Sequence, residues 1–195
     1  LVQGLGIIEI GLPLLNTGGA RDFPTAMGRP LPAFDAELRD DEGRTMPVGS
    51  TGEIWIKGPG MFDAYLSPWQ TVDEVCVDGW FPTGDLAETD ASGRFYLRGR
   101  KKSVLNVNGM KVFPEEVESV IAKLPAVLHC RVTGISHALL GTVPSAEVIL
   151  HQGEILTQRE LIRWCRKSLA VYKIPVRVKF VDELPLTENG KIRRA

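Results

Sequence analysis

From Gly99 to Glu118 the chain reads GRKKSVLNVNGMKVFPEEVE, which combines a basic linker, a hairpin and the start of a helix. Three consecutive cations (Arg100–Lys102) open the segment, and apolar and polar residues alternate behind them as in a strand. Asn108-Gly109 predicts a tight hairpin turn, because both residues tolerate positive φ. Pro114 suits a first helical position, and the carboxylates behind it favour the positive end of the helix dipole. The chain is β-rich before this segment and has the pattern of a compact α+β unit after it.

Composition excludes several classes of protein. The chain has 195 residues, of which 44% are hydrophobic and 24% charged, enough for one domain or two small ones with buried cores. A net charge of −1 implies no general affinity for nucleic acid or for an anionic membrane. The three cysteines are far apart and form neither a disulfide framework nor a metal-binding pattern. With no long apolar run, these features predict a cytoplasmic protein without a transmembrane segment.

Residues 1–101 are predicted to form a small β-barrel or a folded sheet, because short alternating segments recur between glycine-rich turns. Leu1–Glu9 is expected to be a buried strand with Glu9 at its solvated end. Asp90–Gly93 is expected to be a hairpin turn. The other predicted strands are Ala36–Arg39, Glu53–Lys57 and Phe95–Leu97.

Residues 102–195 are predicted to form two helices packed on a three-stranded sheet. The first helix has an apolar face that continues to Leu124 and stops at Pro125. The second begins at a capping box formed by Thr157 and Glu160 and continues past Cys165 to Leu169. The predicted strands are Ala126–Ile135, Pro144–His151 and Val176–Val181. The fold class is therefore α+β, with a boundary between residues 101 and 102.

Two short segments could carry chemistry. Thr83-Gly84-Asp85 places a carboxylate after a glycine turn, where it could accept hydrogen bonds from two neighbouring hydroxyls, as on a ribose. The alternative is an aspartate that only caps a turn. Asn189-Gly190-Lys191 presents a lysine that could stabilise an oxyanion or phosphate, or could be an ordinary solvated residue. Lys111 and Lys173 are predicted to be surface residues.

Six segments in this order resemble the motifs of the adenylate-forming superfamily, which comprises acyl-CoA synthetases, peptide-synthetase adenylation domains and luciferases. Together they extend over nearly the whole chain, so the resemblance is specific. The segments are QGLGIIE (3–9), GEIWIKG (52–58), GWFPTGDL (79–86), GRKKSVLNVNGMKVFPEEVE (99–118), YKIP (172–175) and LPLTENGKI (184–192).

The resemblance implies a two-step reaction. A carboxylic acid attacks the α-phosphate of Mg²⁺-bound ATP and gives an acyl-adenylate, and a thiol, usually that of CoA, then displaces AMP. Residues 1–101 would be the β-rich end of a large adenylate-forming domain, and residues 102–195 a small mobile C-terminal domain. The chain begins at Leu1 inside an expected strand, so it is interpreted as the C-terminal part of a longer enzyme. The phosphate loop would lie upstream, and the chain alone is not expected to be active.

The resemblance also implies roles for nucleotide-site residues. Asp85 would hold the ribose hydroxyls, and Arg100 would lie near the ribose and phosphate. Gln3 and Gly4 belong to the segment that binds the nucleotide. Glu9 would help bind Mg²⁺, a hard cation that prefers carboxylate oxygens.

The remaining roles belong to the second half of the chain. Lys191 would stabilise negative charge during adenylate formation. Lys102 would be the hinge about which the small domain rotates. The Asn108-Gly109 turn would then line the path of the CoA pantetheine, because glycine allows close approach of the backbone.

Two departures from the motif leave alternatives open. Leu5 stands where the family usually has an aromatic residue that packs on adenine, and Ile8 where it has a threonine. The first interpretation is an acyl-CoA synthetase acting on a small-molecule carboxylic acid. The second is an adenylation domain that loads a carrier-protein thiol. The third is a non-catalytic relative with a degenerate nucleotide site.

Overall fold

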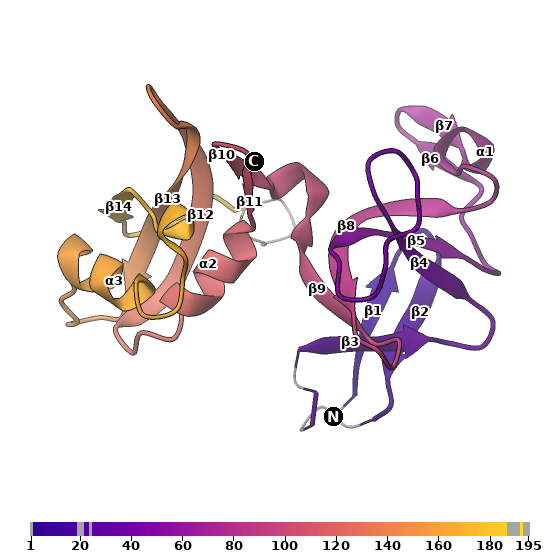
Figure 1. The fold of residues 1–195 in the computed structure, drawn as a ribbon, viewed down its shortest axis with the longest axis horizontal. Helices are drawn as coiled ribbons and strands as arrows, with labels where there is room; N and C mark the ends of the chain where they lie inside the picture. The colour runs from indigo at the N-terminus through magenta and orange to yellow at the C-terminus, as the bar shows by residue number, and fades with distance from the viewer. Residues whose placement is uncertain (1, 19–21, 24, 187–191, 193–195) are drawn as a thin grey trace. The chain divides into compact units, whose positions relative to one another are not determined.

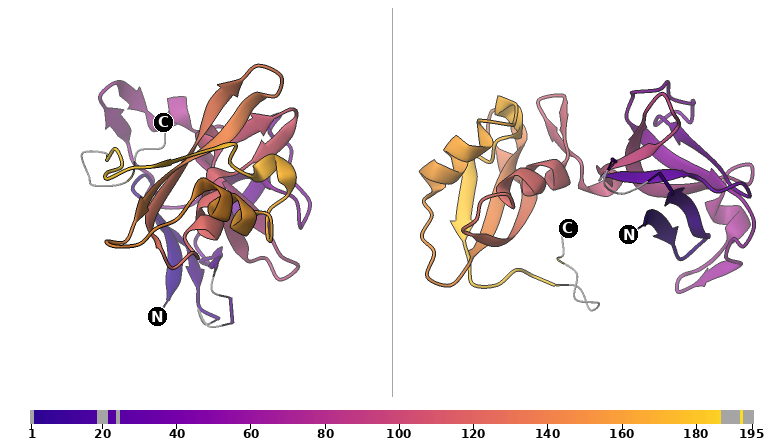
Figure 2. Two further views of the ribbon diagram at one scale, coloured as in Figure 1. Left: turned by 90° about the vertical axis from the view of Figure 1, so that its left-hand side faces the viewer. Right: turned by 90° about the horizontal axis from the view of Figure 1, so that it is seen from below.

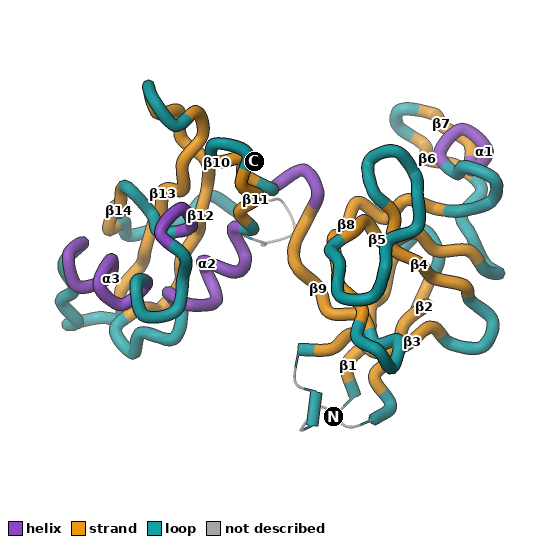
Figure 3. Tube along the Cα trace, in the orientation of Figure 1, coloured by secondary structure: helices purple, strands orange, loops and turns teal. Residues whose placement is uncertain are grey.

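The computed structural model describes residues 2–18, 22–23, 25–186 and 192. The chain divides into two compact units, Leu1–Lys101 and Lys102–Ala195 (Figure 1). The first unit consists mainly of strands, whereas the second combines strands with two longer helices (Figure 3). The α+β class predicted from the sequence is therefore confirmed. No helix among the described residues is long and apolar enough to cross a membrane.

The first unit is built on a seven-stranded antiparallel sheet with the order β1-β2-β3-β9-β8-β5-β4. Its core combines residues from opposite ends of this order, such as Leu14 of β2 and Leu38 of β4, so the sheet folds over on itself. No pairing of described residues joins β1 to β4, so the unit is a folded sheet and not a closed barrel. The strands are β1 (Gln3–Ile7), β2 (Gly11–Asn16), β3 (Ala26–Pro30), β4 (Asp35–Arg39), β5 (Gly52–Lys57), β8 (Phe81–Thr89) and β9 (Phe95–Arg100).

A short excursion between β5 and β8 contains the remaining elements of this unit. β6 (Ala64–Leu66) and β7 (Trp69–Thr71) form a separate hairpin, and α1 (Val72–Val75) follows directly. Thr71 is the N-cap of α1, and its backbone N–H and hydroxyl both donate to the Glu74 carboxylate in the first turn.

The first unit corrects one sequence expectation and confirms another. Leu1–Glu9 is not a buried strand: β1 is an edge strand that alternates between half-buried and exposed residues, because only β2 pairs with it. The Asp90–Gly93 turn between β8 and β9 is confirmed. Asp90 accepts hydrogen bonds from the backbone N–H groups of Ser92 and Arg94, which lowers its pKa.

The second unit contains the three predicted strands, but its sheet has five strands rather than three. β12 pairs with one edge of β13, while β10 and the parallel strand β14 pair with β13 along its other edge. The Asn108-Gly109 hairpin therefore joins the sheet through β10, which the alternating pattern alone could not indicate. The strands are β10 (Leu105–Val107), β11 (Met110–Val112), β12 (Val127–His137), β13 (Gly141–Leu150) and β14 (Arg177–Phe180).

Helices α2 (Pro114–Ile121) and α3 (Gln158–Cys165) pack side by side against this sheet (Figure 2). The Trp164 indole N–H on α3 donates to the Val120 carbonyl of α2 at 2.8 Å. The predicted start of α2 at Pro114 and the capping box of α3 are confirmed. Both helices end earlier than expected, because the chain turns after Ile121 and after Cys165. Two short 3₁₀ helices, η1 (Lys101–Ser103) and η2 (Val171–Lys173), complete the elements.

A substitution at Leu161 tests how much of the stability of the second unit depends on the interface between α3 and the sheet. Its side chain is fully buried in the core. Leu161→Ala is expected to lower the free energy of unfolding by about 2–5 kcal/mol, because it removes buried apolar contacts and leaves a cavity. Urea denaturation followed by circular dichroism measures this loss.

Leu139→Ala is the matched control for the same deletion at an exposed position. The Leu139 side chain is 89% exposed, so the change in unfolding free energy should stay within about 0.5 kcal/mol. Equal losses in the two variants would contradict this description of the core.

Candidate functional site

Asp85 and Arg100, two predicted site residues, form an ion pair across neighbouring strands. Asp85 on β8 is opposite Arg100 on β9, and the Arg100 Nε lies 2.8 Å from the Asp85 Oδ1. The Asp85 side chain is only 6% exposed, whereas that of Arg100 is 63% exposed. The guanidinium therefore neutralises a buried carboxylate from the solvent side.

A bulge in β8 holds Asp85 in this position. Between Trp55 and Glu53 of β5, the pairing partner on β8 moves from Pro82 to Leu86, so residues 83–85 bulge out of register. Gly84 sits at φ +72°, which favours glycine. Asp85 thus belongs to a strand, and the interpretation that it caps a turn is wrong.

Hydrogen bonds from neighbouring groups fix the bulge. The Thr83 hydroxyl donates to the Ile54 carbonyl at 2.9 Å and accepts from the Asp85 N–H at 3.1 Å. The Gly84 N–H donates to the Glu53 carboxylate at 3.1 Å. The backbone geometry of the bulge therefore depends on Glu53, a second buried acid beside Asp85.

Glu53 lies beside this candidate site, and sequence reasoning did not single it out. Its side chain is only 8% exposed, and its Oε2 lies 3.0 Å from the Lys101 Nζ. The same ammonium lies 2.8 Å from Asp41, and the hydrogen bonds to Asp41 and Glu53 raise the pKa of Lys101. The only sequence indication was the position of Glu53 inside the GEIWIKG segment. The alternating pattern of this segment predicts a half-buried strand, but it does not show whether the Glu53 carboxylate is buried or solvated.

Gln3 and Gly4 lie on the edge strand β1. A side chain at Gly4 would place its Cβ 2.7 Å from the Leu14 carbonyl oxygen, so the close approach of β1 to β2 requires glycine. The Gln3 Oε1 atom is buried and has no hydrogen-bond partner in the described part of the chain.

Glu9 follows β1 and is tied to the β5–β8 connection. Its carbonyl accepts from the Phe62 N–H, and its carboxylate accepts from the Tyr65 hydroxyl, both at 2.8 Å. Burial and this hydrogen bond raise the pKa of Tyr65 to about 12. Glu9 is half-buried, which corrects the expectation of a solvated strand end.

An aromatic cluster connects Glu9 to the strand that carries Asp85. The Phe62 ring lies 4.6 Å from the Tyr65 ring and 6.0 Å from the Phe81 ring, measured between centroids. Phe81 is the first residue of β8. The structure therefore links the Glu9 turn to the start of that strand through packed rings.

The donor set at Glu9 suits one kind of cation. Within the described residues, no group of three or more histidine, cysteine or acidic side chains could hold a metal by itself. A single carboxylate fits Mg²⁺, which keeps several waters and takes its other oxygens from substrate phosphates. Glu9 could therefore supply one ligand to a magnesium ion brought in with a nucleotide.

The two residues that depart from the family motif occupy different environments. Leu5 is half-buried and packs against the core of the first unit. Ile8 is fully exposed. An exposed Ile8 makes no contribution to this core.

In the second unit, Lys102 and the Asn108-Gly109 turn are exposed. Asn108 has φ +49° and Gly109 φ +83°, and the Asn106 side chain accepts from the Gly109 N–H at 2.8 Å. The predicted hairpin turn is thereby confirmed. Lys102 lines a cavity of about 480 Å³ together with hydroxyl-bearing side chains at Ser103 and Thr133.

Lys173 corrects a sequence expectation. Its ammonium lies 2.7 Å from both carboxylate oxygens of Glu116, and its side chain is only 18% exposed. Lys173 therefore joins η2 to the first turn of α2, where a cation satisfies a carboxylate, and it is not a free surface residue. Lys111 is exposed, as expected. Lys191 lies outside the described residues.

Two family models match the chain. The model of the AMP-binding enzyme matches residues 1–66, and that of the AMP-binding enzyme C-terminal domain matches residues 116–191.

Curated relatives align with the whole chain or nearly all of it. A long-chain-fatty-acid–CoA ligase from Yersinia pestis is 37% identical over 196 residues, which cover 100% of this chain and 34% of the relative. A feruloyl-CoA synthase from an Amycolatopsis species is 35% identical over 193 residues, which cover 98% of this chain and 39% of the relative. The chain thus spans between a third and two-fifths of the length of these relatives.

The chain also matches solved structures over nearly its whole length. o-Succinylbenzoate CoA synthetase from Bacillus subtilis, in complex with the acyl-adenylate intermediate OSB-AMP, matches with a TM-score of 0.90 at 29% identity. The match covers 98% of this chain and 39% of that enzyme. The amide bond synthetase McbA from Marinactinospora thermotolerans matches with a TM-score of 0.86 at 31% identity, covering 98% of this chain and 40% of that protein.

The Tyr65–Glu9 contact predicts a late-titrating tyrosine. The pKa of Tyr65 is raised from 10.0 to about 12, so folding disfavours its ionised form. The stabilisation from this contact should be complete below pH 10 and should disappear as the pH rises to about 12. Ultraviolet absorbance of tyrosinate in the folded protein measures the titration.

Two variants assign the titration to this residue. Tyr65→Phe should remove the last step, and Glu9→Gln should lower the pKa of Tyr65 without restoring its ordinary value, because burial remains. An identical high-pH titration in wild type and Tyr65→Phe would contradict the assignment.

Proposed function

The chain belongs to the adenylate-forming superfamily of AMP-binding enzymes, and we propose that it is the C-terminal part of an acyl-CoA synthetase. The complete enzyme would activate a carboxylic acid with ATP and transfer the acyl group to CoA. Leu1–Lys101 would end its large domain, and Lys102–Ala195 would be its small mobile domain.

The buried Asp85 carboxylate is the observation that carries this proposal. A carboxylate held in a strand bulge, with Arg100 beside it, has the acceptor atoms to bind two neighbouring ribose hydroxyls. Arg100 adds an exposed cation beside the same site, where a phosphate would gain a charge-assisted partner. Gln3 Oε1, Gly4 and the Glu9 carboxylate add an acceptor, a close backbone approach and a cation ligand.

In the first half-reaction, a substrate carboxylate oxygen attacks the α-phosphorus of ATP and the bond to pyrophosphate breaks. Lys191 would place its ammonium near the substrate carboxylate and α-phosphate, where negative charge accumulates. Bound Mg²⁺ would neutralise phosphate charge. Glu9 would hold that ion through one carboxylate oxygen.

In the second half-reaction, a thiol sulfur attacks the acyl carbonyl and AMP leaves. Lys102 would act as the hinge about which the small domain rotates between the two half-reactions. This rotation would withdraw Lys191 and present a different face of the small domain to the active site. The exposed Asn108-Gly109 turn would then border the pantetheine path. Its positive φ angles leave a backbone that a thin ligand can approach closely.

The identity of the acceptor and of the acid is the finer part of the proposal. Relatives named as CoA ligases favour CoA over a carrier-protein thiol. Their names include both a long-chain fatty acid and the aryl acid of feruloyl-CoA, so the acid class needs direct assay. A non-catalytic relative is the remaining alternative, and the departures at Leu5 and Ile8 are its motivation.

Pyrophosphate release by the full-length enzyme tests the proposed reaction. With Mg-ATP and a panel of fatty and aryl acids, release should depend on one class of acid, and thioester should form when CoA is added. Asp85→Asn should weaken ATP binding about tenfold or more, because it removes a charged acceptor of the ribose hydroxyls. Silence across the panel, together with undetectable ATP binding, would instead support the non-catalytic alternative.

Lys191→Ala should separate the two half-reactions. We expect adenylate formation to fall at least about 100-fold, the order seen when one preorganised donor to developing charge is removed. Thioester formation from synthetic acyl-adenylate and CoA should remain within a few-fold of wild type. Lys123→Ala is the control, because it removes an exposed lysine of the second unit outside the hairpin. Lys111→Ala is unsuitable, because Lys111 lies in the hairpin itself. Equal losses in both half-reactions of Lys191→Ala would contradict the assigned role.

A further inference from the structure

The Asn108-Gly109 hairpin is attached to the sheet of the second unit by little pairing of its own. Its strands β10 and β11 have three residues each, and among the described residues β10 pairs with β13 only where Val107 is opposite Gly141. Val107 and Val112 are buried in the core, whereas the turn between them is exposed. Because a two-stranded hairpin is at best marginally stable alone, the position of this turn depends on the elements that pack against it.

Helix α2 and the 3₁₀ helix η2 are those elements. Only Phe113 separates β11 from α2, so the hairpin continues directly into the first turn of the helix. On the other side, η2 lies against β11 and β13. The Val176 N–H, just after η2, donates to the Pro144 carbonyl of β13 at 2.9 Å. The base of the hairpin therefore meets both the helix that continues from it and a segment that is anchored to the sheet.

One ion pair joins these two supports. The Lys173 ammonium at the end of η2 lies 2.7 Å from both carboxylate oxygens of Glu116 in the first turn of α2. The Lys173 side chain is 18% exposed and that of Glu116 is 38% exposed, so the pair is screened less than one on an open surface. The contact closes a ring that leads from β11 through Phe113 and α2 to η2, and from η2 back to β11.

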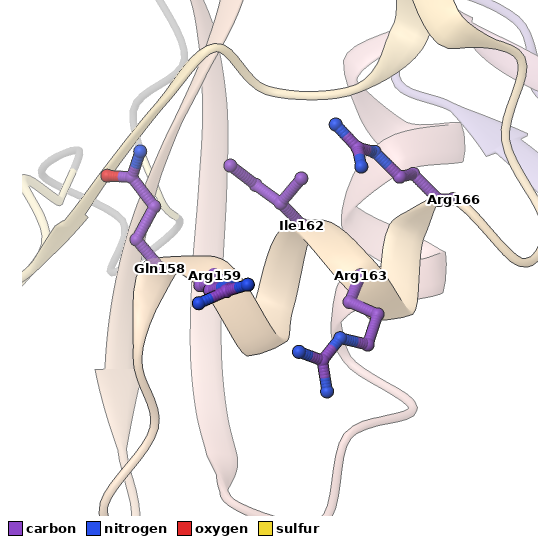
Figure 4. Close-up of a pocket in the computed structure, with 5 residues that line it drawn as sticks. All are labelled: Gln158, Arg159, Ile162, Arg163 and Arg166. Atoms are coloured by element: carbon purple, nitrogen blue, oxygen red, sulfur yellow. The ribbon is translucent and has the colours of Figure 1, made fainter.

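Other cations of the same region are not built into the fold in this way. Residues 158–180 contain seven lysines and arginines and one carboxylate, a net charge of +6. Figure 4 shows Arg159, Arg163 and Arg166 extending from α3 and bordering a shallow hollow of about 550 Å³. All three side chains are exposed, and among the described residues no ion pair engages them. Lys173 differs from them in burial and in having a partner, so its charge serves an internal contact.

We propose that the Glu116–Lys173 pair is a positioning element for the second half-reaction, a role that rests on the function proposed above for the Asn108-Gly109 turn. In that half-reaction a bond forms between the thiol sulfur and the acyl carbon, AMP leaves with the electron pair of the broken carbon–oxygen bond, and the thiol proton passes to solvent. The pair touches none of these atoms. It fixes the base of the hairpin, so that the turn borders the pantetheine path in one geometry.

The proposed role is specific to one half-reaction. A shift of about 1 Å in the placement of a reactant can cost about 100-fold in rate, so thioester formation should be sensitive to the orientation of the hairpin. Adenylate formation would use Lys191 and the nucleotide site of the first unit and would not use this turn. Loss of the pair should therefore slow the thiol step and spare the first step.

Kinetics of the separate half-reactions of the full-length enzyme test the proposal. Lys173→Met retains most of the apolar stem of the side chain and removes its charge. Thioester formation from synthetic acyl-adenylate and CoA should fall about 10–100-fold in kcat/KM, while acid-dependent pyrophosphate release in a single turnover should stay within about twofold of wild type. Lys123→Met is the matched control, because it removes an exposed lysine of the same unit and should leave both half-reactions unchanged.

Exchange of the two charges separates the ion pair from the identity of either residue. Lys173→Glu should slow thioester formation more than Lys173→Met does, because two carboxylates then face each other. Glu116→Lys/Lys173→Glu restores opposite charges at the same two positions and should recover most of that loss, a non-additive result that two independent residues would not give. Circular dichroism verifies that each variant folds.

Hydrogen exchange measures the support of the hairpin without any assay of catalysis. In Lys173→Met, the amides of residues 105–112 should exchange about tenfold faster or more, while those of the β12–β13 ladder keep their wild-type rates. The proposal is overturned if exchange and thioester formation are both unchanged in Lys173→Met, if both half-reactions fall equally, or if the charge-exchanged variant is no better than Lys173→Glu. Wild type that forms no thioester would instead refute the proposed function, and with it this role of the pair.

Discussion

The first unit depends on the neutralisation of two buried carboxylates by consecutive cations. Glu53 and Asp85 lie on neighbouring strands, and Lys101 and Arg100 pair with them. A buried carboxylate without a partner is strongly destabilising, so these pairs restrict where the end of β9 can lie. The β8 bulge uses the same acids, because the Gly84 N–H also donates to Glu53. Of the three cations in the basic linker, two are thereby committed to the first unit, and Lys102 is the first residue of the second.

The second unit uses two acids of α2, the buried Glu118 and the partly exposed Glu116, to join this helix to the sheet and to η2. The Glu118 carboxylate on α2 accepts from the Val132 N–H of β12 at 2.9 Å, and Glu116, two residues earlier, binds Lys173. The Glu118 contact holds α2 to the sheet, and the Glu116 contact holds the same helix to η2. The consequence is a rigid support for the hairpin that precedes α2, while its Asn108-Gly109 turn remains exposed. A rigid base with an exposed, glycine-containing tip suits a segment proposed to border a ligand path.

Local patterns predicted the parts of this fold that depend on local chemistry. The Asn108-Gly109 turn, the Pro114 helix start and the Thr157 capping box each follow from the conformational preferences of a few adjacent residues. Sequence alone could not place Glu53 or count the strands of the second sheet, because both depend on contacts between distant segments. The sequence predicts a binding role for Asp85, but its position in a bulge depends on the register of β5 against β8. Lys173 was misjudged for the same reason, since its partner lies 57 residues away.

Net charge illustrates a further limit of composition as a guide to partners. Interactions between exposed charges are screened over about 10 Å at moderate salt, so a partner responds to nearby cations and not to the sum over the chain. A chain with a total of −1 can therefore carry a segment of +6 whose six cations outside the Glu116 pair remain exposed. Glu160 inside the segment belongs to a helix cap and Glu116 pairs with Lys173, while Glu154 precedes the segment and Asp182 and Glu183 follow it directly. The charge that a partner meets therefore depends on which neighbouring acids are already paired and on where the segment is bounded, and the net charge of the chain does not give it.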